Sequence, residues 1–295
     1  MDRKHFIKTL AVLGITPQLS FSKKGSNSPI RFGVISDLHY ADRPPRGSRY
    51  FKDSLNKLGN YVEEMNRLNP DFILQLGDFK DEDEIPNPQA TIQYLKDMEK
   101  EYSKYQGERF HALGNHDHDS ISKEEFLDHT KNSGKAKGKA YYSFSKGHCH
   151  FIVLDANYKK DGQAYNKGNF DWKDCHVPQH QIEWLKQEVK STEDKVIVVF
   201  IHQRLDDTFS NPIYCPNNAA QVRAILETNK NTKLVIQGHD HKGGFCTING
   251  IYYWTVKGAV EGAGKENNSF SLFEISKSHI KIKGFFNAES NILDI

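Results

Sequence analysis

Short apolar segments recur along the first half of the chain, and polar or glycine-containing segments separate them. Apolar runs bounded by turn residues predict buried strands, whereas apolar residues spaced three and four apart predict amphipathic helices. We therefore expect strands over 31–36, 71–76 and 109–113. We expect helices over 50–68 and 89–102. In the first of these helices the apolar residues follow spacings of three, four and three: Leu55, Leu58, Val62 and Met65.

The second half repeats this alternation less regularly and ends in strands alone. We expect strands over 141–145, 150–154, 195–201 and 233–237, and helices over 178–190 and 216–228. From residue 245 onward the pattern predicts strands over 245–248, 251–256, 269–275 and 279–286. Alternating strands and helices favour an α/β fold. Since no repeat or linker interrupts the pattern, residues 23–295 are expected to form one domain.

The first 22 residues differ in composition from the rest of the chain. Arg3, Lys4 and Lys8 precede a short apolar stretch over 9–15, and residues 20–22 offer a small-x-small cleavage site. The stretch is too short to span a membrane, and the combination predicts an export signal over 1–22 and a periplasmic protein. The segment around Arg3 also resembles a twin-arginine signal in which Lys4 replaces the second arginine. The alternative is an N-terminal tail in a cytoplasmic protein.

Composition limits the possible partners. The chain has 295 residues, of which 40 are basic and 38 acidic, so its net charge is +2. This balance, without a Lys/Arg-rich run, argues against a nucleic-acid polymer as partner. The four cysteines show no C-x-x-C spacing, which argues against a zinc ribbon or a thioredoxin-type site and leaves disulfide pairing open: Cys149, Cys175, Cys215 and Cys246.

Side chains that can bind metal ions follow five of the predicted strands. They are Asp37 and His39, Asp78, Asn115 with His116 and Asp117, His202, and His239 with His241. In open α/β sheets ligands bind beyond the carboxyl ends of strands, so these side chains should meet. Residues two apart on extended backbone point to the same side, which lets each D-x-H or H-x-H pair address one ion. Two ions about 3.5–4 Å apart can clamp both oxygens of an in-line displacement at phosphorus.

In this order the clusters resemble the motifs of the calcineurin-like metallophosphoesterases: D-x-H, G-D-x-x-D, G-N-H-D, a lone His and G-H-x-H. The resemblance implies one α/β domain in which two mixed β-sheets pack as a sandwich with flanking helices. It implies two-metal hydrolysis of phosphoanhydride or phosphodiester bonds. One ion would be held by Asp37, His39, Asp78 and His241. The other would be held by Asp78, Asn115, His202 and His239, with Asp78 bridging both.

Further roles follow from the same resemblance. His116 would act on the leaving-group oxygen and Asp117 would orient it, while Asp81 would support the ligands from behind. Purple acid phosphatases carry an iron-binding tyrosine at the position of Asp81. The carboxylate here favours two divalent ions, and oxygen and imidazole ligands suit Mn²⁺, with Fe²⁺ or Zn²⁺ as alternatives. His118 and Asp119, which follow the third cluster, are expected to be solvated.

A narrower resemblance concerns the substrate. Segments 32–37, 46–51, 238–244 and 257–261 look like those of the manganese-dependent ADP-ribose/CDP-alcohol diphosphatases. This implies a small, nucleotide-derived phosphorylated substrate. Arginines suit the binding of its second phosphate, with solvated surface positions as the alternative; the candidates are Arg46, Arg49 and Arg204. Tyr214 and Tyr253 are candidates for stacking on a base, with core packing as the alternative. The loop 158–175 is either a lid or a surface excursion.

Two other functions remain open from the sequence. One is a general exported phosphodiesterase or phosphomonoesterase. The other is a non-catalytic scaffold that keeps the fold as a protein-binding surface, which the presence of every expected ligand argues against.

Overall fold

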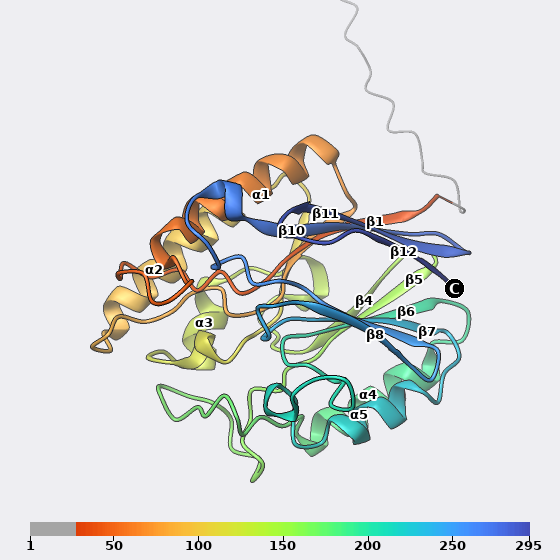
Figure 1. Cartoon of the computed structure of the whole chain (residues 1–295). Helices are drawn as coiled ribbons and strands as arrows, with labels where there is room; N and C mark the ends of the chain where they lie inside the picture. Colours follow the sequence, from red (N-terminus) through yellow and green to blue (C-terminus); the bar gives the residue numbers. More distant parts are fainter. Residues whose placement is uncertain (1–27) are drawn as a thin grey trace, which may run out of the picture.

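The computed structural model describes residues 28–295 as two six-stranded sheets packed face to face with helices outside (Figure 1). The predicted export signal over 1–22 lies outside the described residues. The helices are α1 (Ser54–Leu68), α2 (Pro88–Tyr102), α3 (Lys123–His129), α4 (Gln179–Ser191) and α5 (Ala219–Leu226). In Figure 1, α1 and α2 lie on one outer side of the sandwich, and α4 and α5 lie on the other.

The first sheet joins the N-terminal strands to the C-terminal ones. Its order is β12-β11-β10-β1-β2-β3. The strands are β1 (Ile30–Ile35), β2 (Phe72–Gln75), β3 (Glu108–His111), β10 (Ser269–Ile275), β11 (His279–Phe286) and β12 (Asn291–Asp294). β1 pairs in parallel with β2 and antiparallel with β10, so the sheet is mixed. The parallel half, β1-β2-β3, directs three carboxyl ends to one edge.

The second sheet has the order β4-β5-β6-β7-β9-β8. Its strands are β4 (Tyr142–Lys146), β5 (Cys149–Val153), β6 (Val196–Ile201), β7 (Thr232–Gln237), β8 (Gly244–Ile248) and β9 (Ile251–Thr255). The central strands β5, β6, β7 and β9 are parallel, while β4 and β8 pair antiparallel at the edges. The predicted α/β sandwich of two mixed sheets is therefore confirmed.

Aromatic rings fill the space between the sheets. The buried Phe32 ring of β1 stacks on Phe72 at 5.0 Å and on Phe273 at 5.2 Å, measured between ring centroids. It meets Phe151 and Phe200 of the other sheet edge-on, at 5.4 and 5.6 Å. Such pairs add about 0.5–1.5 kcal/mol each to the burial of their area. Because one ring from β1 touches both sheets, the core fixes the relative position of the strand ends that carry the site.

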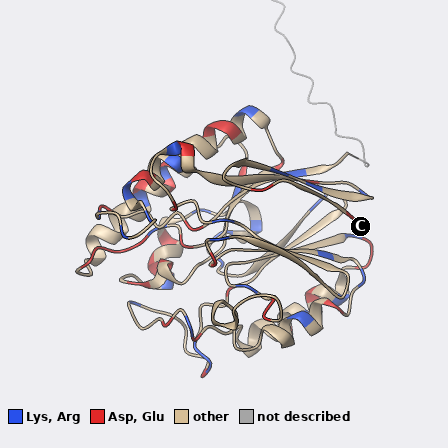
Figure 2. Ribbon diagram, viewed as in Figure 1, with Lys and Arg blue, Asp and Glu red and all other residues tan. Residues whose placement is uncertain are grey.

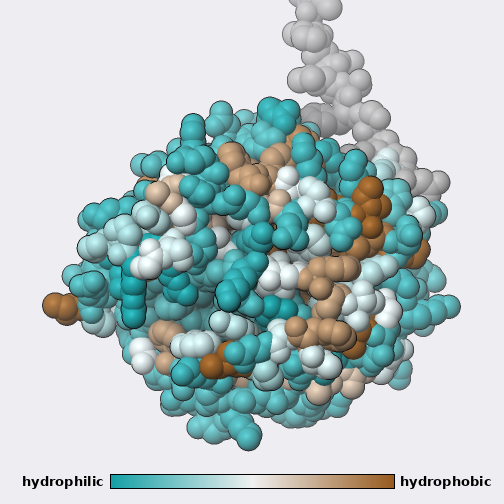
Figure 3. Space-filling model, in the orientation of Figure 1, coloured by the Kyte–Doolittle hydropathy of each residue, from teal (hydrophilic) through white to brown (hydrophobic). Residues whose placement is uncertain are grey.

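The outer surface carries charges of both signs, which alternate along the helices in the view of Figure 2. The same face is mostly hydrophilic in the space-filling view, with apolar side chains in small groups (Figure 3). Across residues 28–295, no helix is both long and apolar enough to cross a membrane.

Candidate metal centre

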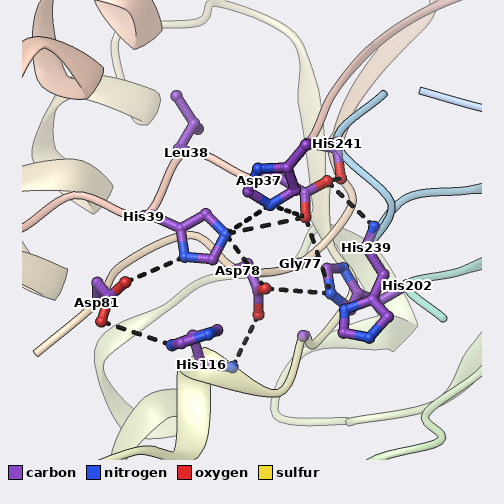
Figure 4. Close-up of polar contacts among 12 residues, drawn as sticks. Asp37, Leu38, His39, Gly77, Asp78, Asp81, His116, His202, His239 and His241 are labelled. Atoms are coloured by element: carbon purple, nitrogen blue, oxygen red, sulfur yellow. Dashed lines mark hydrogen bonds and ion pairs between the residues drawn. The ribbon is translucent and has the colours of Figure 1, made fainter. Parts of the chain in front are cut away.

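The metal-competent side chains come together where the parallel strands of both sheets end. Asp37 and His39 follow β1, Asp78 follows β2, and Asn115 follows β3. From the second sheet, His202 follows β6, and the pair His239 and His241 follows β7. Apart from Asn115, these side chains point toward one another from separate loops in Figure 4, and Asn115 lines the same pocket. The sequence expectation that five strand ends form one site therefore agrees with their positions in the structure.

The backbone of these loops is unusual at the predicted ligands. Asp37, His39, Asp78 and His239 all adopt left-handed conformations, with φ of 54°, 49°, 50° and 68°. Non-glycine residues seldom occupy this region, and strained conformations persist where surrounding structure holds them. Here the loops hold each other, because Asp37 N donates to Gly77 O at 3.1 Å and His39 N donates to Asp78 O at 2.8 Å. The left-handed conformation directs each of these four side chains toward the shared site.

Two glycines beside the ligands allow the loops to approach. Gly77 has φ of 99°, and a Cβ there would lie 2.6 Å from His202 Nδ1. At Gly114, a Cβ would lie 2.2 Å from Asp78 N and 2.3 Å from Asp78 Oδ1, closer than real Cβ contacts allow. Gly77 therefore permits both the left-handed turn after β2 and the close approach of His202. Gly114 permits the close approach of its loop backbone to the backbone at Asp78.

The first group of ligand atoms comprises Asp37, His39 and His241. His39 Nε2 lies 3.1 Å from His241 Nε2, and His241 Nε2 lies 3.4 Å from Asp37 Oδ1. Two nitrogen ligands on one ion, each at about 2.1 Å, lie roughly 3 Å apart when they occupy neighbouring positions. The spacing of these atoms therefore fits one ion.

The second group comprises Asp78, His202 and His239. Asp78 Oδ2 lies 3.2 Å from His202 Nε2 in this group and 3.4 Å from His39 Nε2 in the first. One carboxylate thus stands between the two groups. That is the position predicted for a bridging ligand.

Buried polar atoms without partners test whether these residues suit metal ions. Asp37 Oδ1, both amide atoms of Asn115, His202 Nε2 and His239 Nε2 are buried and have no hydrogen-bond partner within residues 28–295. Leaving one such atom unpaired costs about 1–3 kcal/mol. Several of them aimed at one small space fit a binuclear site, because two ions would satisfy all of them.

A second layer of hydrogen bonds orients the imidazoles. His39 Nδ1 lies 3.2 Å from Asp81 Oδ2, His202 Nδ1 lies 2.9 Å from Leu76 O, and His241 Nδ1 lies 2.6 Å from Glu261 Oε1. Each contact engages Nδ1 and leaves Nε2 for a metal, the usual second-layer arrangement. Sequence reasoning gave Glu261 no role, and the one available signal was the similarity of segment 257–261 to the diphosphatases.

The electrostatics divide the histidines into two kinds. Burial lowers the pKa of His39 to about 4 and that of His239 to about 3, so both are neutral and ready to bind metal at neutral pH. Burial also opposes protonation of His202, but Asp78 and Asp37 outweigh it and raise its pKa to about 9. Metal binding must therefore displace a proton from His202.

His116 lies at the rim of this centre, and its carboxylate partner is Asp81. His116 Nδ1 lies 3.5 Å from Asp81 Oδ1. Burial opposes its protonation, yet Asp81 and Asp78 raise its pKa to about 9. The resemblance predicted Asp117 as the orienting group. The structure instead places the Asp117 carboxylate on backbone amides, accepting from Phe79 N at 2.9 Å and Gly114 N at 2.8 Å.

Asp117 therefore acts on the loops rather than on His116. Because it joins the loop after β2 to the loop after β3, it fixes Asp78 relative to Asn115. His118 and Asp119, expected to be solvated, are buried. Asp119 pairs with the buried Lys80, whose ammonium also donates to His116 O at 2.6 Å. This buried pair supports the backbone that carries His116.

A pocket of about 570 Å³ opens over the metal centre. Arg46 and Arg49, predicted as substrate residues, both line it, and so does Arg43, which sequence reasoning missed. Arg204 does not line the pocket: its guanidinium is held by Asp206 at 2.7 and 2.9 Å and by Asp240 at 2.7 Å. The structure therefore gives no support to Arg204 as a substrate residue. The side chain instead holds Asp240, which lies between the ligands His239 and His241.

Aromatic side chains complete the pocket. Phe170 and Trp172 come from the loop 158–175, and Tyr214 comes from the segment between β6 and α5. Tyr253, the other candidate for stacking, is buried in the core. The loop is tied to the fold, since Lys167 N donates to Ile121 O and Gly168 N donates to His118 O, at 3.3 and 3.2 Å. It is therefore an anchored wall of the pocket.

The model of the calcineurin-like phosphoesterase family matches residues 30–243, which include every predicted ligand. The chain belongs to this family. It is a metal-dependent phosphoesterase, and its two groups of ligand atoms form the family's binuclear site.

Similar proteins narrow the relationship. The chain is 26% identical to a manganese-dependent ADP-ribose/CDP-alcohol diphosphatase from Arabidopsis thaliana, over 86% of this chain and 93% of that protein. It is 23% identical to the enzyme of the same name from Xenopus tropicalis, over 89% and 93%.

Solved structures show the same fold. A dimetal phosphatase from Danio rerio superposes with a TM-score of 0.77 at 20% identity, covering 91% of this chain and 99% of that one. A purple acid phosphatase from yellow lupin superposes with a TM-score of 0.60 at 14% identity, over 91% and 53%.

The four cysteines are free in the structure: Cys149, Cys175, Cys215 and Cys246.

Proposed function

We propose that this phosphoesterase hydrolyses the diphosphate bond of nucleoside-diphosphate conjugates such as ADP-ribose or CDP-alcohols, with two Mn²⁺ ions. The proposal rests on one observation: the binuclear site and three arginines line the same pocket. The similarity to the manganese-dependent ADP-ribose/CDP-alcohol diphosphatases of Arabidopsis and Xenopus supports the substrate class and the metal.

The arginines supply what a second phosphate requires. Arg46 and Arg49 face each other across a tight hairpin, with backbone bonds of 3.0 and 3.1 Å, and directly opposed residues of a hairpin project to the same side. Arg43 packs its guanidinium over Phe51 at 4.6 Å and leaves its buried Nε without a hydrogen-bond partner in the described chain. Guanidinium groups bind phosphate by charge-assisted, often bidentate hydrogen bonds. A phosphomonoester has no second phosphate to offer these arginines.

The seven predicted ligands would hold the two ions in the division given by the resemblance. When bound, the ions polarise a phosphoryl oxygen and lower the pKa of water. Asp78, which lies between both groups, would be shared by the two ions, and Asp81 and Glu261 keep the imidazoles turned inward.

His116 is the group that can donate a proton to the leaving oxygen. Asp81 engages its Nδ1, so Nε2 is the atom free for substrate, and a quarter of the side chain remains exposed to the pocket. A positioned acid contributes about 10²–10⁴-fold to such reactions. Lys80 holds the backbone carbonyl of His116 and so limits movement of the ring.

A panel of four substrates tests the proposal: ADP-ribose, CDP-choline, a cyclic nucleotide and p-nitrophenyl phosphate, each with Mn²⁺ and with product identification. We expect the highest kcat/KM for the first two, with two monophosphates as products. Preference for the cyclic nucleotide or the monoester would replace the proposal with a general phosphodiesterase or phosphomonoesterase. Reconstitution with Fe²⁺ or Zn²⁺ in parallel tests the choice of Mn²⁺.

A further inference from the structure

Two aromatic rings, Trp172 and Tyr214, form an aromatic wall of the pocket beside His239. Trp172 and Tyr214 lie nearly parallel, with ring centroids 5.8 Å apart and an interplanar angle of 30°. Both rings contact the imidazole of His239, at 5.9 and 5.6 Å. A third pocket-lining ring, Phe170, contacts His116 at 5.4 Å. The wall therefore adjoins the metal centre directly.

The wall is built into the fold. Within the loop, the hydroxyl of the fully buried Tyr165 lies within hydrogen-bond distance of Asp171 O, at 2.6 Å, and of Asp174 O, at 2.9 Å, on either side of Trp172. Tyr214 O accepts from Arg204 N at 3.0 Å, which ties the other ring to the loop after β6. Yet Trp172 and Tyr214 remain half-buried and face the pocket. Rings held in place with an open face can stack on a ligand at little entropic cost.

Trp172 and Arg43 lie at different ends of the centre. Arg43 approaches Asp81, at 3.7 Å between Nη1 and Oδ1, whereas Trp172 contacts His239. Figure 4 shows Asp81 and His239 on opposite sides of the ligand cluster. A substrate that reaches from one end to the other would place one group against the aromatic rings, its reacting phosphorus at the metal centre and a second anionic group near Arg43.

We propose that Trp172 and Tyr214 bind the nucleobase of the substrate by stacking and thereby determine preference for nucleosides over other phosphate esters. This inference rests on the proposed function and adds the residues that recognise the base. The base stacks against the wall and not between its rings, since insertion would require about 7–8 Å between them.

Aromatic rings also bind quaternary ammonium groups, so choline is the competing occupant. Its charge disfavours it here. The wall contacts His239, a predicted ligand, and an ammonium group beside two divalent ions would be repelled, whereas a neutral base would not. The acidic residues among the pocket-lining residues are Asp78, Asp81 and Glu82, all from the loop after β2 and none from the wall segments.

Product inhibition isolates the wall from catalysis. The probes are AMP and ribose 5-phosphate, which differ by the base, tested as competitive inhibitors on whichever ester the enzyme hydrolyses best. We expect AMP to bind roughly 5- to 100-fold more tightly than ribose 5-phosphate in the wild type. Trp172→Leu should bring the two inhibition constants together, and Trp172→Phe should keep most of the difference. The control is Trp184→Leu, since Trp184 of α4 packs on Tyr141 at 5.0 Å, away from the pocket.

Each outcome decides for or against the wall. Equal weakening of both inhibitors by Trp172→Leu, or equal affinity in the wild type, would overturn the inference. So would Trp172-dependent binding of phosphocholine over its neutral isostere 3,3-dimethylbutyl phosphate, which would assign the wall to an ammonium group. If AMP discrimination depends on Trp172 while ADP-ribose is not hydrolysed, the base site stands and the proposed diphosphatase function fails.

Discussion

Asp78 is the residue on which both halves of the metal centre depend. Its Oδ2 lies 3.4 Å from His39 Nε2 and 3.2 Å from His202 Nε2, and its Oδ1 accepts from His116 N at 2.8 Å. Two buried carboxylates, Asp37 and Asp78, would repel each other without cations nearby. The site is therefore suited to bound cations, because the protein's own side chains supply only part of the positive charge that these carboxylates need.

Asp78→Asn should lower the affinity for both ions, because the bridging charge is lost. We expect kcat/KM to fall on the order of 100-fold or more, beyond the 10- to 100-fold typical of supporting residues. The measurement is metal content per chain by elemental analysis after equilibrium dialysis. Asp240→Asn is the matched control, since Asp240 lies between two ligands but points to Arg204. Two ions retained at full affinity in Asp78→Asn would exclude a bridging role.

His116→Ala should separate a leaving-group acid from a ligand. Its Nδ1 is engaged by Asp81, so the ring can be removed while both ions stay bound. The loss should reach about 10²–10⁴-fold on esters with alkoxide leaving groups. It should be much smaller on p-nitrophenyl esters, whose leaving group needs little protonation. Equal losses on both, with metal content still at two, would refute this role.

The roles of some individual residues cannot be read from the motifs. The motif order predicts all seven ligand positions, because each predicted ligand follows a strand end that the apolar pattern marks. The choice between Asp81 and Asp117 as partner of His116 could not be made this way, since both lie in motifs beside it. It depends on which carboxylate the 3₁₀ turn His116–His118 directs toward backbone amides. The position of Arg204 could not be read from the motifs either, because its contacts with Asp206 and Asp240 form only in the folded chain.

At the scale of elements, the site depends on loops that contact one another backbone to backbone. Gly114→Ala would place a methyl group 2.2 Å from Asp78 N and push the loops after β2 and β3 apart. We expect unfolding free energy to fall by about 1–3 kcal/mol, as for overpacking, together with weakened metal binding. Chemical denaturation of the metal-free and metal-bound protein measures both effects.

Gly59→Ala is the matched control. Gly59 lies inside α1, where alanine is favoured by up to about 1 kcal/mol, and its nearest neighbour is the movable Glu101 carboxylate at 3.0 Å. Stability should stay equal or rise, with metal binding unchanged. If Gly114→Ala behaved like Gly59→Ala, close approach of the two loops would not matter to the site.

The elements that the sequence missed are the short ones. α3 has seven residues, too few for a clear apolar period, although its capping box of Ser122 and Glu125 was a usable signal. β12 has four residues and lies at the sheet edge, so its pattern is mostly exposed. Tyr214 was a candidate for stacking on a base, but its neighbour Trp172 was missed for a different reason. Trp172 lies in a polar loop, and only the buried Tyr165 and the backbone bonds to residues 118 and 121 show that this loop is anchored.

At the scale of the whole molecule, we propose that residues 1–22 are an export signal with no part in catalysis. The nearest predicted ligand is Asp37, and β1 begins at Ile30. A chain lacking 1–22 should keep kcat/KM and metal content within twofold of the full chain, about 0.4 kcal/mol. Intact-mass measurement of the exported protein should find the segment removed. A mature cytoplasmic chain that still starts at Met1 would contradict export.

At this scale the central expectation is that activity requires two metal ions, which residues from both sheets hold jointly. Metal titration of the chelated protein tests it most directly, with activity on ADP-ribose followed against Mn²⁺ added per chain. We predict no activity after chelation, little at one equivalent, and full recovery near two equivalents, with no tyrosinate-iron absorption band. Full activity of the chelated chain, or saturation at one equivalent, would contradict the account.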